Sequence, residues 1–216
     1  MSQPNPKVLI VEGKNDQHAV AELIKANGVI WGEKKEDWVV EIKEYGGFEN
    51  IISEKAISAA FKGNTKILGI IVDADEDILP RWESLKKQCS TIFPSFPANP
   101  QAGGLAIGNT TGQKLGIWVM PDNVSSGKLE NFLCKLVPGD QSALFNYAKT
   151  ATTEAQILHA PFASKDRVKA EIHTWLAWQE TPGLPFGTAV KALVLRPDSL
   201  YAQTFVRWFK QLYELT

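Results

Sequence analysis

The 216-residue sequence is poor in the residues that build disulfide scaffolds and zinc sites. It has only two cysteines, Cys89 and Cys134, and three histidines, His18, His159 and His173. The cysteines lie far apart without a C-x-x-C motif, and the histidines show no zinc-ligand spacing. This scarcity argues against a zinc module and favours two reduced, buried cysteines of an intracellular protein.

The sequence also lacks a strong charge of either sign and any long apolar run. Its formal net charge is −1, with a pI near 6.3, which argues against wholesale coating of nucleic acid but permits a local basic groove or a metal-bridged phosphate contact. No stretch approaches the roughly 18 apolar residues of a membrane span. The segment Met1–Pro6 is short and polar, unlike a signal peptide. We therefore expect a cytoplasmic protein without a membrane partner.

Motifs for nucleotide cradles and serine nucleophiles are absent as well. Neither G-x-G-x-x-G nor the P-loop pattern occurs, and Gly13-Lys14 alone does not predict a phosphate-binding loop. The G-x-S-x-G elbow is missing, so the sequence does not support α/β-hydrolase chemistry.

What the sequence does contain is an acidic residue at the end of a buried strand. The run Val8–Val11 is unbroken, apolar and mostly β-branched, which is typical of a strand covered on both faces of a parallel sheet. It ends at Glu12 and Gly13, after which apolar residues recur at helical spacing until Asn27. In open α/β sheets ligands bind at the carboxyl ends of strands, so Glu12 becomes a candidate site residue.

A second buried strand ends in the same way. The apolar run Ile67–Val72 is followed by the D-x-D pair Asp73 and Asp75. If both strands are parallel in one sheet, Glu12, Asp73 and Asp75 converge at one edge, where they repel one another. Mg²⁺ would relieve that repulsion. Taken singly, Glu12 could be a solvated or capping residue, and the acids that follow Val72 could simply favour a helix start.

The order of the predicted elements indicates an α/β fold. Two further strands are predicted at Trp38–Lys43 and Lys114–Met120, and a helix is predicted at Phe48–Phe61, before the strand Ile67–Val72. We therefore expect a Rossmann-like, four-stranded, mainly parallel sheet flanked by helices. The segment Phe93–Gly112 is rich in proline and glycine and predicts a loop with room for one short strand. Residues 1–140 would form this domain, and residues 141–216 a helical extension packed on it.

Other candidate residues follow later in the chain. Asp122 comes after the fourth strand, and Glu130 lies in the next predicted helix. Lys165 lies between a turn and a helix, where it is either a surface lysine or a cation that stabilises charge on a phosphate. Trp175 and Trp178 fit core packing better than base stacking.

The motifs Val11–Gly13 and Val72–Asp75 resemble the signature of the Toprim domain, which is a hydrophobic strand ending in Glu-Gly and a later D-x-D. That domain is shared by topoisomerases, bacterial primases, recombination mediators and the OLD-family nucleases. The chain looks closest to stand-alone bacterial Toprim-like proteins of unassigned activity, related to the OLD family. The resemblance covers most of the chain, but only these two motifs are specific.

The OLD-type resemblance implies further site residues. Asp16 matches a second acid, Asp122 and Glu130 match a third metal-binding region, and Lys165 matches a lysine after the core. It implies Mg²⁺ or Mn²⁺ as cofactor and nucleic acid as partner. The ATPase domain of the larger relatives is absent, so a partner protein such as an ATPase could supply what is missing, and the chain could also form a homo-oligomer.

Three functions therefore stay open at this point. The first is metal-dependent phosphodiester hydrolysis of nucleic acid, with Glu12, Asp73, Asp75 and Lys165 as catalytic residues and with Glu12, Asp16, Asp73, Asp75, Asp122 and Glu130 as metal ligands. The second is a non-catalytic metal-binding module that works through a partner protein. The third is a small-molecule phosphohydrolase with Asp73 as nucleophile and Asp75 as acid.

Overall fold

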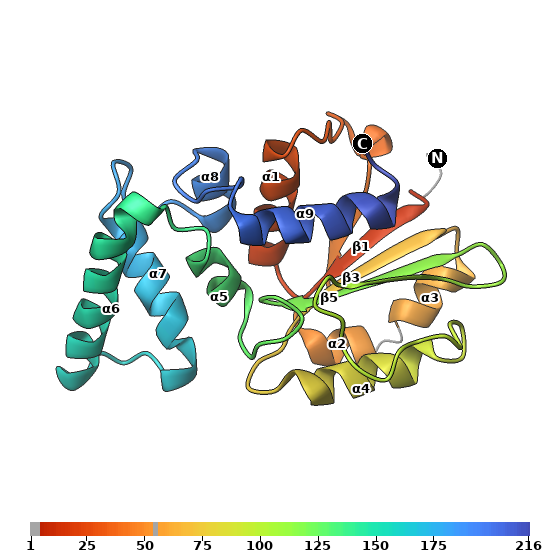
Figure 1. The fold of residues 1–216 in the computed structure, drawn as a ribbon, viewed down its shortest axis with the longest axis horizontal. Coiled ribbons are helices and arrows are strands. Elements are labelled where there is room, and N and C mark those ends of the chain that lie inside the picture. Colours follow the sequence, from red (N-terminus) through yellow and green to blue (C-terminus); the bar gives the residue numbers. More distant parts are fainter. Residues whose placement is uncertain (1–4, 54–55) are drawn as a thin grey trace.

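The computed structural model describes residues 5–53 and 56–216, and it shows an α/β fold in which helices cover both faces of one sheet (Figure 1). The helices are α1 (Lys14–Ala26), α2 (Phe48–Ser53), α3 (Ala56–Lys62), α4 (Ile78–Cys89), α5 (Leu129–Cys134), α6 (Ser142–Ile157), α7 (Arg167–Ala177), α8 (Phe186–Lys191) and α9 (Leu200–Tyr213), with short 3-10 turns η1 (Lys35–Asp37), η2 (Gly139–Gln141) and η3 (Ser164–Asp166).

The sheet has five strands in the order β2-β1-β3-β5-β4. Strands β1 (Lys7–Val11), β2 (Glu41–Glu44), β3 (Ile67–Asp73) and β5 (Lys114–Met120) run parallel, as expected. The strand expected at Trp38–Lys43 is β2, which begins only at Glu41. Strand β4 (Leu105–Gly108) pairs antiparallel with β5. The four-stranded prediction was therefore wrong in the number of strands, because β4 is too short and too closely flanked by glycine to give a clear apolar run.

One helix predicted from periodicity has different bounds in the structure. The single helix expected at Phe48–Phe61 corresponds to α2 and α3, and residues 54–55 between them lie outside the described part. Helix α8 begins at Phe186, directly after Pro185. Proline is favoured just before or at the first helical position, because its fixed φ suits the start of a helix.

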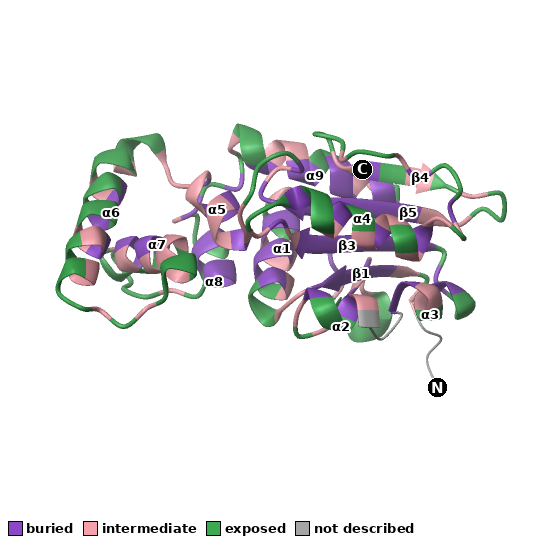
Figure 2. Cartoon of the chain, turned by 90° about the horizontal axis from the view of Figure 1, so that it is seen from below, coloured by how far each residue is buried: buried purple, intermediate pink, exposed green. Residues whose placement is uncertain are grey.

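Each face of the sheet has its own hydrophobic core. Residues of β1, β3 and β5 that point to one side pack under α1 and α9, and those that point to the other side pack over α2, α3 and α4 (Figure 1). The central strands are buried almost completely (Figure 2). This two-sided burial explains why the strands read as continuous apolar runs rather than as alternating patterns.

Helix α9 brings the end of the chain back onto the sheet. The hydroxyl of Tyr213 donates a buried hydrogen bond of 2.7 Å to the carbonyl of Val8. A Cβ at Gly69 would lie 2.3 Å from the Tyr213 hydroxyl, and a Cβ at Gly116 would lie 2.2 Å from Leu212. These two strand positions therefore need glycine so that α9 can approach the sheet closely.

Helices α6 and α7 form an antiparallel pair beyond α5, at one end of the molecule (Figure 1). Most of the surface of α6 is exposed, and its inner side packs on α7 through Phe145 and Trp175 (Figure 2). Trp178, which was expected in the core together with Trp175, is instead exposed and lies beside Tyr147. Helix α8 packs on α1, where Gly187 lies against the backbone of His18.

No helix within the described residues is long and apolar enough to cross a membrane.

Candidate active site

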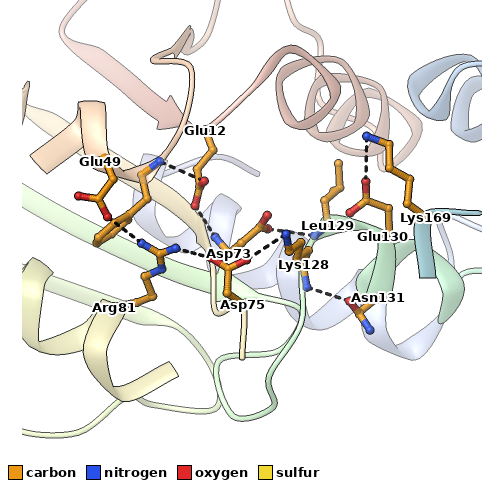
Figure 3. Close-up of polar contacts among 11 residues, drawn as sticks. Glu12, Glu49, Asp73, Asp75, Arg81, Lys128, Leu129, Glu130, Asn131 and Lys169 are labelled. Carbon is orange, nitrogen blue, oxygen red and sulfur yellow. Dashed lines mark hydrogen bonds and ion pairs between the residues drawn. The ribbon is translucent and has the colours of Figure 1, made fainter. Parts of the chain in front are cut away.

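Strands β1 and β3 are parallel neighbours, so their carboxyl ends lie side by side, and Glu12, which follows β1, connects the two ends. Its Oε1 accepts a hydrogen bond of 2.7 Å from the backbone N–H of Asp73, and its Oε2 accepts one of 3.1 Å from the N–H of Phe48 (Figure 3). Glu12 is thus held from two sides by backbone donors of β3 and α2. This arrangement fixes its carboxylate beside the end of β3.

Asp16 and Asp73 are held in the same region by the starts of two helices. Asp16 lies in the first turn of α1, where its Oδ2 accepts a 3.2 Å hydrogen bond from the N–H of Gly13, and its exposed fraction is 9%. Asp73 is the last residue of β3, and its Oδ1 accepts a 3.0 Å hydrogen bond from the N–H of Leu129 at the start of α5. Among the described residues, no ion pair neutralises either carboxylate.

Four carboxylates consequently share one electrostatic environment. Burial raises the pKa of Asp73 to about 8, and the charges of Asp16, Glu12 and Glu130 contribute to this rise. Burial likewise raises the pKa of Asp16 to about 7, with contributions from Glu12 and Glu130. The pKa of Glu12 is also raised, chiefly by burial. We refer to Glu12, Asp16, Asp73 and Glu130 as the carboxylate cluster.

Asp75, the second acid of the D-x-D motif, lies in a different setting. Its backbone has a φ of 54° and forms an isolated antiparallel bridge with Gly127, with N–H to O distances of 3.0 and 2.7 Å. Its carboxylate pairs with the guanidinium of Arg81 and, at 3.0 Å, with Nζ of Lys128 (Figure 3). Burial alone would raise the pKa of Asp75, but the hydrogen bonds from these two cations lower it below its usual value.

Asp16, Asp73 and Glu130 of the carboxylate cluster line two adjoining pockets together with several cations, whereas Glu12 lines neither pocket. The larger pocket, of about 740 Å³, lies between the loop after β3, the start of α5 and the start of α7, and its lining includes Asp73, Asp75, Arg81, Lys128, Glu130, Lys165 and Lys169. A smaller pocket of about 300 Å³ lies on the α1 side and adds Asp16. The two share Asp73, Glu130 and Lys169, and Lys169 Nζ lies 3.9 Å from the Glu130 carboxylate (Figure 3).

The structure does not bring Asp122 into this group. Its carboxylate accepts hydrogen bonds from the N–H groups of Val124 and Ser125, at 3.1 and 2.7 Å, and pairs with Lys135. Burial would raise its pKa, but the hydrogen bond from Lys135 and those from the backbone lower it. Asp122 lines neither of the two pockets described above. These contacts give Asp122 a structural role in the turn after β5.

Three cations in the larger pocket were missed by sequence analysis. Arg81 lies in α4, Lys128 comes directly before α5, and Lys169 lies in α7. Each belongs to a different segment, so no local motif groups them. Lys165, which was predicted as a candidate, lies in η3 and lines the same pocket. A signal for Lys128 was available, since it precedes Glu130 in the segment that supplies a candidate ligand.

The donors of the carboxylate cluster suit a hard divalent cation. Buried carboxylates that raise one another's pKa have oxygens of the type that Mg²⁺ binds, and a cation would relieve their repulsion. In the described part of the chain, no three His, Cys, Asp or Glu side chains are arranged to hold one ion together. Mg²⁺ commonly uses one or two carboxylates, with waters and substrate phosphates completing its octahedron. The cluster therefore fits Mg²⁺ in chemistry and charge, without a preformed protein cage.

Fold and site together define an α/β protein with a carboxylate cluster at the strand ends and a pocket lined by lysine and arginine. The chain belongs to the family described as "Protein of unknown function (DUF3226)", whose model matches residues 6–214. This finding overturns the identification as a Toprim protein, because no Toprim family matches the chain. No curated protein and no solved structure matches it.

Proposed function

We propose that this protein is a Mg²⁺- or Mn²⁺-dependent phosphodiester hydrolase that acts on nucleic acid. The observation that carries the proposal is the carboxylate cluster, in which burial and mutual repulsion raise the pKa values of Asp16 and Asp73 to about 7 and 8. The cluster opens onto a pocket lined by four cationic side chains. Metal-dependent phosphodiester hydrolysis needs acidic groups that bind the metal and cationic groups that offset charge on the phosphate oxygens. Both kinds of group lie next to each other here.

Different residues of the chain would have different roles in this hydrolysis. One or two of the carboxylates of Asp73, Asp16 and Glu130 would hold the metal, which when bound would lower the pKa of a water and offset charge on the phosphate. Glu12 has both oxygens fixed by backbone N–H groups, so it holds the ends of β1 and β3 in place and keeps a lone pair for a water proton. Lys165 lines the pocket and would offset negative charge that develops on the phosphate.

The small-molecule phosphohydrolase hypothesis is less well supported. It needs Asp75 as a general acid, which must carry a proton near neutral pH. The hydrogen bonds from Arg81 and Lys128 lower the pKa of Asp75 instead and keep it ionised. The phosphodiester hypothesis does not require Asp75 to donate a proton.

The test is cleavage of supercoiled plasmid and single-stranded DNA with Mg²⁺ or Mn²⁺. Wild type is compared with Asp73→Asn, which keeps the oxygen that accepts from Leu129 but removes the charge. We expect at least about a 100-fold loss, because even residues that only support metal ligands cost 10- to 100-fold. Asp122→Asn is the matched control, since its carboxylate lies outside the cluster, and it should cleave at close to the wild-type rate.

Two outcomes would count against the proposal. Cleavage by Asp73→Asn at the wild-type rate would show that the carboxylate cluster does not carry the reaction. No cleavage by wild type with either metal would favour the non-catalytic module, in which the cluster binds a metal and a partner protein supplies the activity. A search for that partner would then begin with proteins that bind the full chain only when Mg²⁺ is present.

A further inference from the structure

The two cations around Asp75 come from segments far apart in the sequence. Arg81 lies in the first turns of α4, and Lys128 lies in the loop between β5 and α5. The backbone bridge between Asp75 and Gly127 joins these segments, and the Asp75 carboxylate then contacts both cations, with Oδ1 on Lys128 and Oδ2 on Arg81 (Figure 3). The carboxylate of Asp75 therefore forms ion pairs with both Arg81 and Lys128.

Both cations keep hydrogen-bond donors for a ligand. The guanidinium of Arg81 lies 4.1 Å from the centre of the Phe48 ring, which fixes its plane, and its second acidic partner, Glu49, is 3.5 Å away and 88% exposed. A guanidinium has five N–H donors and an ammonium has three. The contacts with Asp75 and Glu49 use only part of this set, and the side chain of Lys128 is 33% exposed.

The position of this pair distinguishes it from an ordinary surface ion pair. Lys135 and Asp122, for comparison, form a pair of one acid and one cation outside the pocket. Arg81 and Lys128 instead line the same 740 Å³ pocket as Asp73 and Glu130 of the carboxylate cluster. A planar arginine fork beside a lysine ammonium matches the geometry and charge of a phosphate group.

We propose that Arg81 and Lys128, positioned by Asp75, form an anion subsite that binds a phosphate group of the substrate next to the carboxylate cluster. This inference rests on the proposed function for the identity of the substrate, but the binding of phosphate can be measured without turnover. Asp75 is then a positioning residue for cations, rather than the metal ligand that the D-x-D motif had predicted.

The charge of the pocket decides the conditions of the test. The lining includes four cations and six acids, which are Asp73, Asp75, Glu76, Asp77, Glu130 and Asp166. A phosphate entering the metal-free pocket would therefore meet an excess of negative charge. Binding is to be measured in Mg²⁺, which compensates part of that charge, and at low ionic strength, where screening is weak.

The experiment is calorimetric titration of the full chain with inorganic phosphate in Mg²⁺. Lys128→Gln is compared with Lys87→Gln, because Lys87 is exposed on α4 and lies outside the pocket. A charge-assisted hydrogen bond contributes enough that Lys128→Gln should lower the affinity at least about tenfold, while Lys87→Gln leaves it unchanged. Arg81→Lys, which keeps the charge but loses the fork, should give an intermediate loss.

Two further ligands separate the possible sources of the phosphate. A nucleoside monophosphate and a short single-stranded oligonucleotide with hydrolysis-resistant phosphorothioate linkages are titrated in the same way. If Lys128→Gln loses affinity for all three probes, the subsite binds a phosphate group in general. A loss seen with phosphate and the mononucleotide but not with the oligonucleotide would assign it to small phosphate esters.

The outcomes keep the two proposals apart. Equal affinity of wild type and Lys128→Gln for every probe, or no phosphate binding by wild type, would overturn the subsite even if Asp73-dependent cleavage is observed. A tenfold loss in Lys128→Gln without any DNA cleavage would retain the subsite and reject the hydrolase. Mg²⁺ binding and thermal unfolding of each variant show that the fold and the carboxylate cluster are intact.

Discussion

Replacing Asp73 by asparagine should stabilise the metal-free protein at pH 8, although it removes the residue most important for the proposed activity. The pKa of Asp73 rises from 3.8 to about 8 on folding, chiefly because the carboxyl is buried and also because Asp16, Glu12 and Glu130 repel its charge. The folded state therefore holds a proton that the unfolded state has already lost. An asparagine side chain at this position needs no proton and can still accept from the N–H of Leu129.

The sign of the pH dependence follows from this pair of pKa values. The stability that protonated Asp73 contributes is fully present below pH 3.8 and is lost as pH rises through about 8. Wild type and Asp73→Asn should thus be similar near pH 4 and should diverge as the pH rises, with the variant more stable. The rise in pKa corresponds to an upper limit of about 6 kcal/mol. Partial solvation and coupling within the cluster reduce this to roughly 1–3 kcal/mol.

Thermal unfolding between pH 4 and 8, with EDTA or with Mg²⁺, measures the effect. Without metal at pH 8, Asp73→Asn should raise Tm by roughly 3–10 °C. With Mg²⁺ at 100 times its Kd, wild type should gain about 2.7 kcal/mol and the variant almost nothing. The stabilities of the two proteins should therefore become closer, or their order should reverse, when metal is added.

Asp122→Asn provides a control of opposite sign. Lys135 and the backbone donors lower the pKa of Asp122, so its contribution is present above pH 3.8 and is lost as pH falls. Its loss should destabilise the protein at pH 8 by about 0.5–1 kcal/mol. A metal-free Asp73→Asn protein that is less stable than wild type at pH 8, or that gains as much from Mg²⁺, would refute the reasoning about the carboxylate cluster.

Two other predictions follow from neighbouring features. Asp75→Asn should retain Mn²⁺ affinity within about threefold while Asp73→Asn loses it, because Asp75 contacts cations rather than the carboxylate cluster; equal losses in calorimetry would place Asp75 among the ligands. Gly69→Ala should cost about 1–3 kcal/mol in urea unfolding, because its Cβ would lie 2.3 Å from the Tyr213 hydroxyl. Gly103→Ala, whose Cβ meets nothing within 4 Å, should be close to neutral, and a similar cost at both positions would contradict the close packing of α9.

The sequence could predict the centre of the sheet and the meeting of Glu12 with Asp73. Both follow from general rules, because two-sided burial gives continuous apolar runs and parallel neighbours end at the same edge. The register confirms the adjacency, with Ile10 opposite Ile70. The hydrogen bond from the Asp73 N–H to Glu12 then needs only the glutamate side chain to reach across one strand spacing.

The sequence could not predict where β4 pairs or where Asp75 points. The segment Leu105–Gly108 is four residues long, and its position depends on tertiary pairing with β5 rather than on its own pattern. In an ideal strand Asp73 and Asp75 would lie on the same face, since side chains alternate with a period of two. The positive φ of Asp75 and its bridge to Gly127 break that period, and neither can be read from D-x-D alone.

The two acids of this short motif therefore have opposite electrostatic effects, and the difference follows from where the strand ends. Asp73 still belongs to β3, so it stays at the edge of the sheet with Glu12 and Asp16, where burial makes its charge costly. Asp75 lies beyond the strand, where the bridge to Gly127 turns it toward Arg81 and Lys128 and makes its charge favourable. A chain that continued β3 by two residues would place both acids in the cluster and leave the cations without a common partner. Ending the strand at Asp73 thus separates the carboxylate cluster, which we propose binds a divalent cation, from the Arg81–Lys128 pair, which we propose binds phosphate, and Asp73 lines the larger pocket together with that pair.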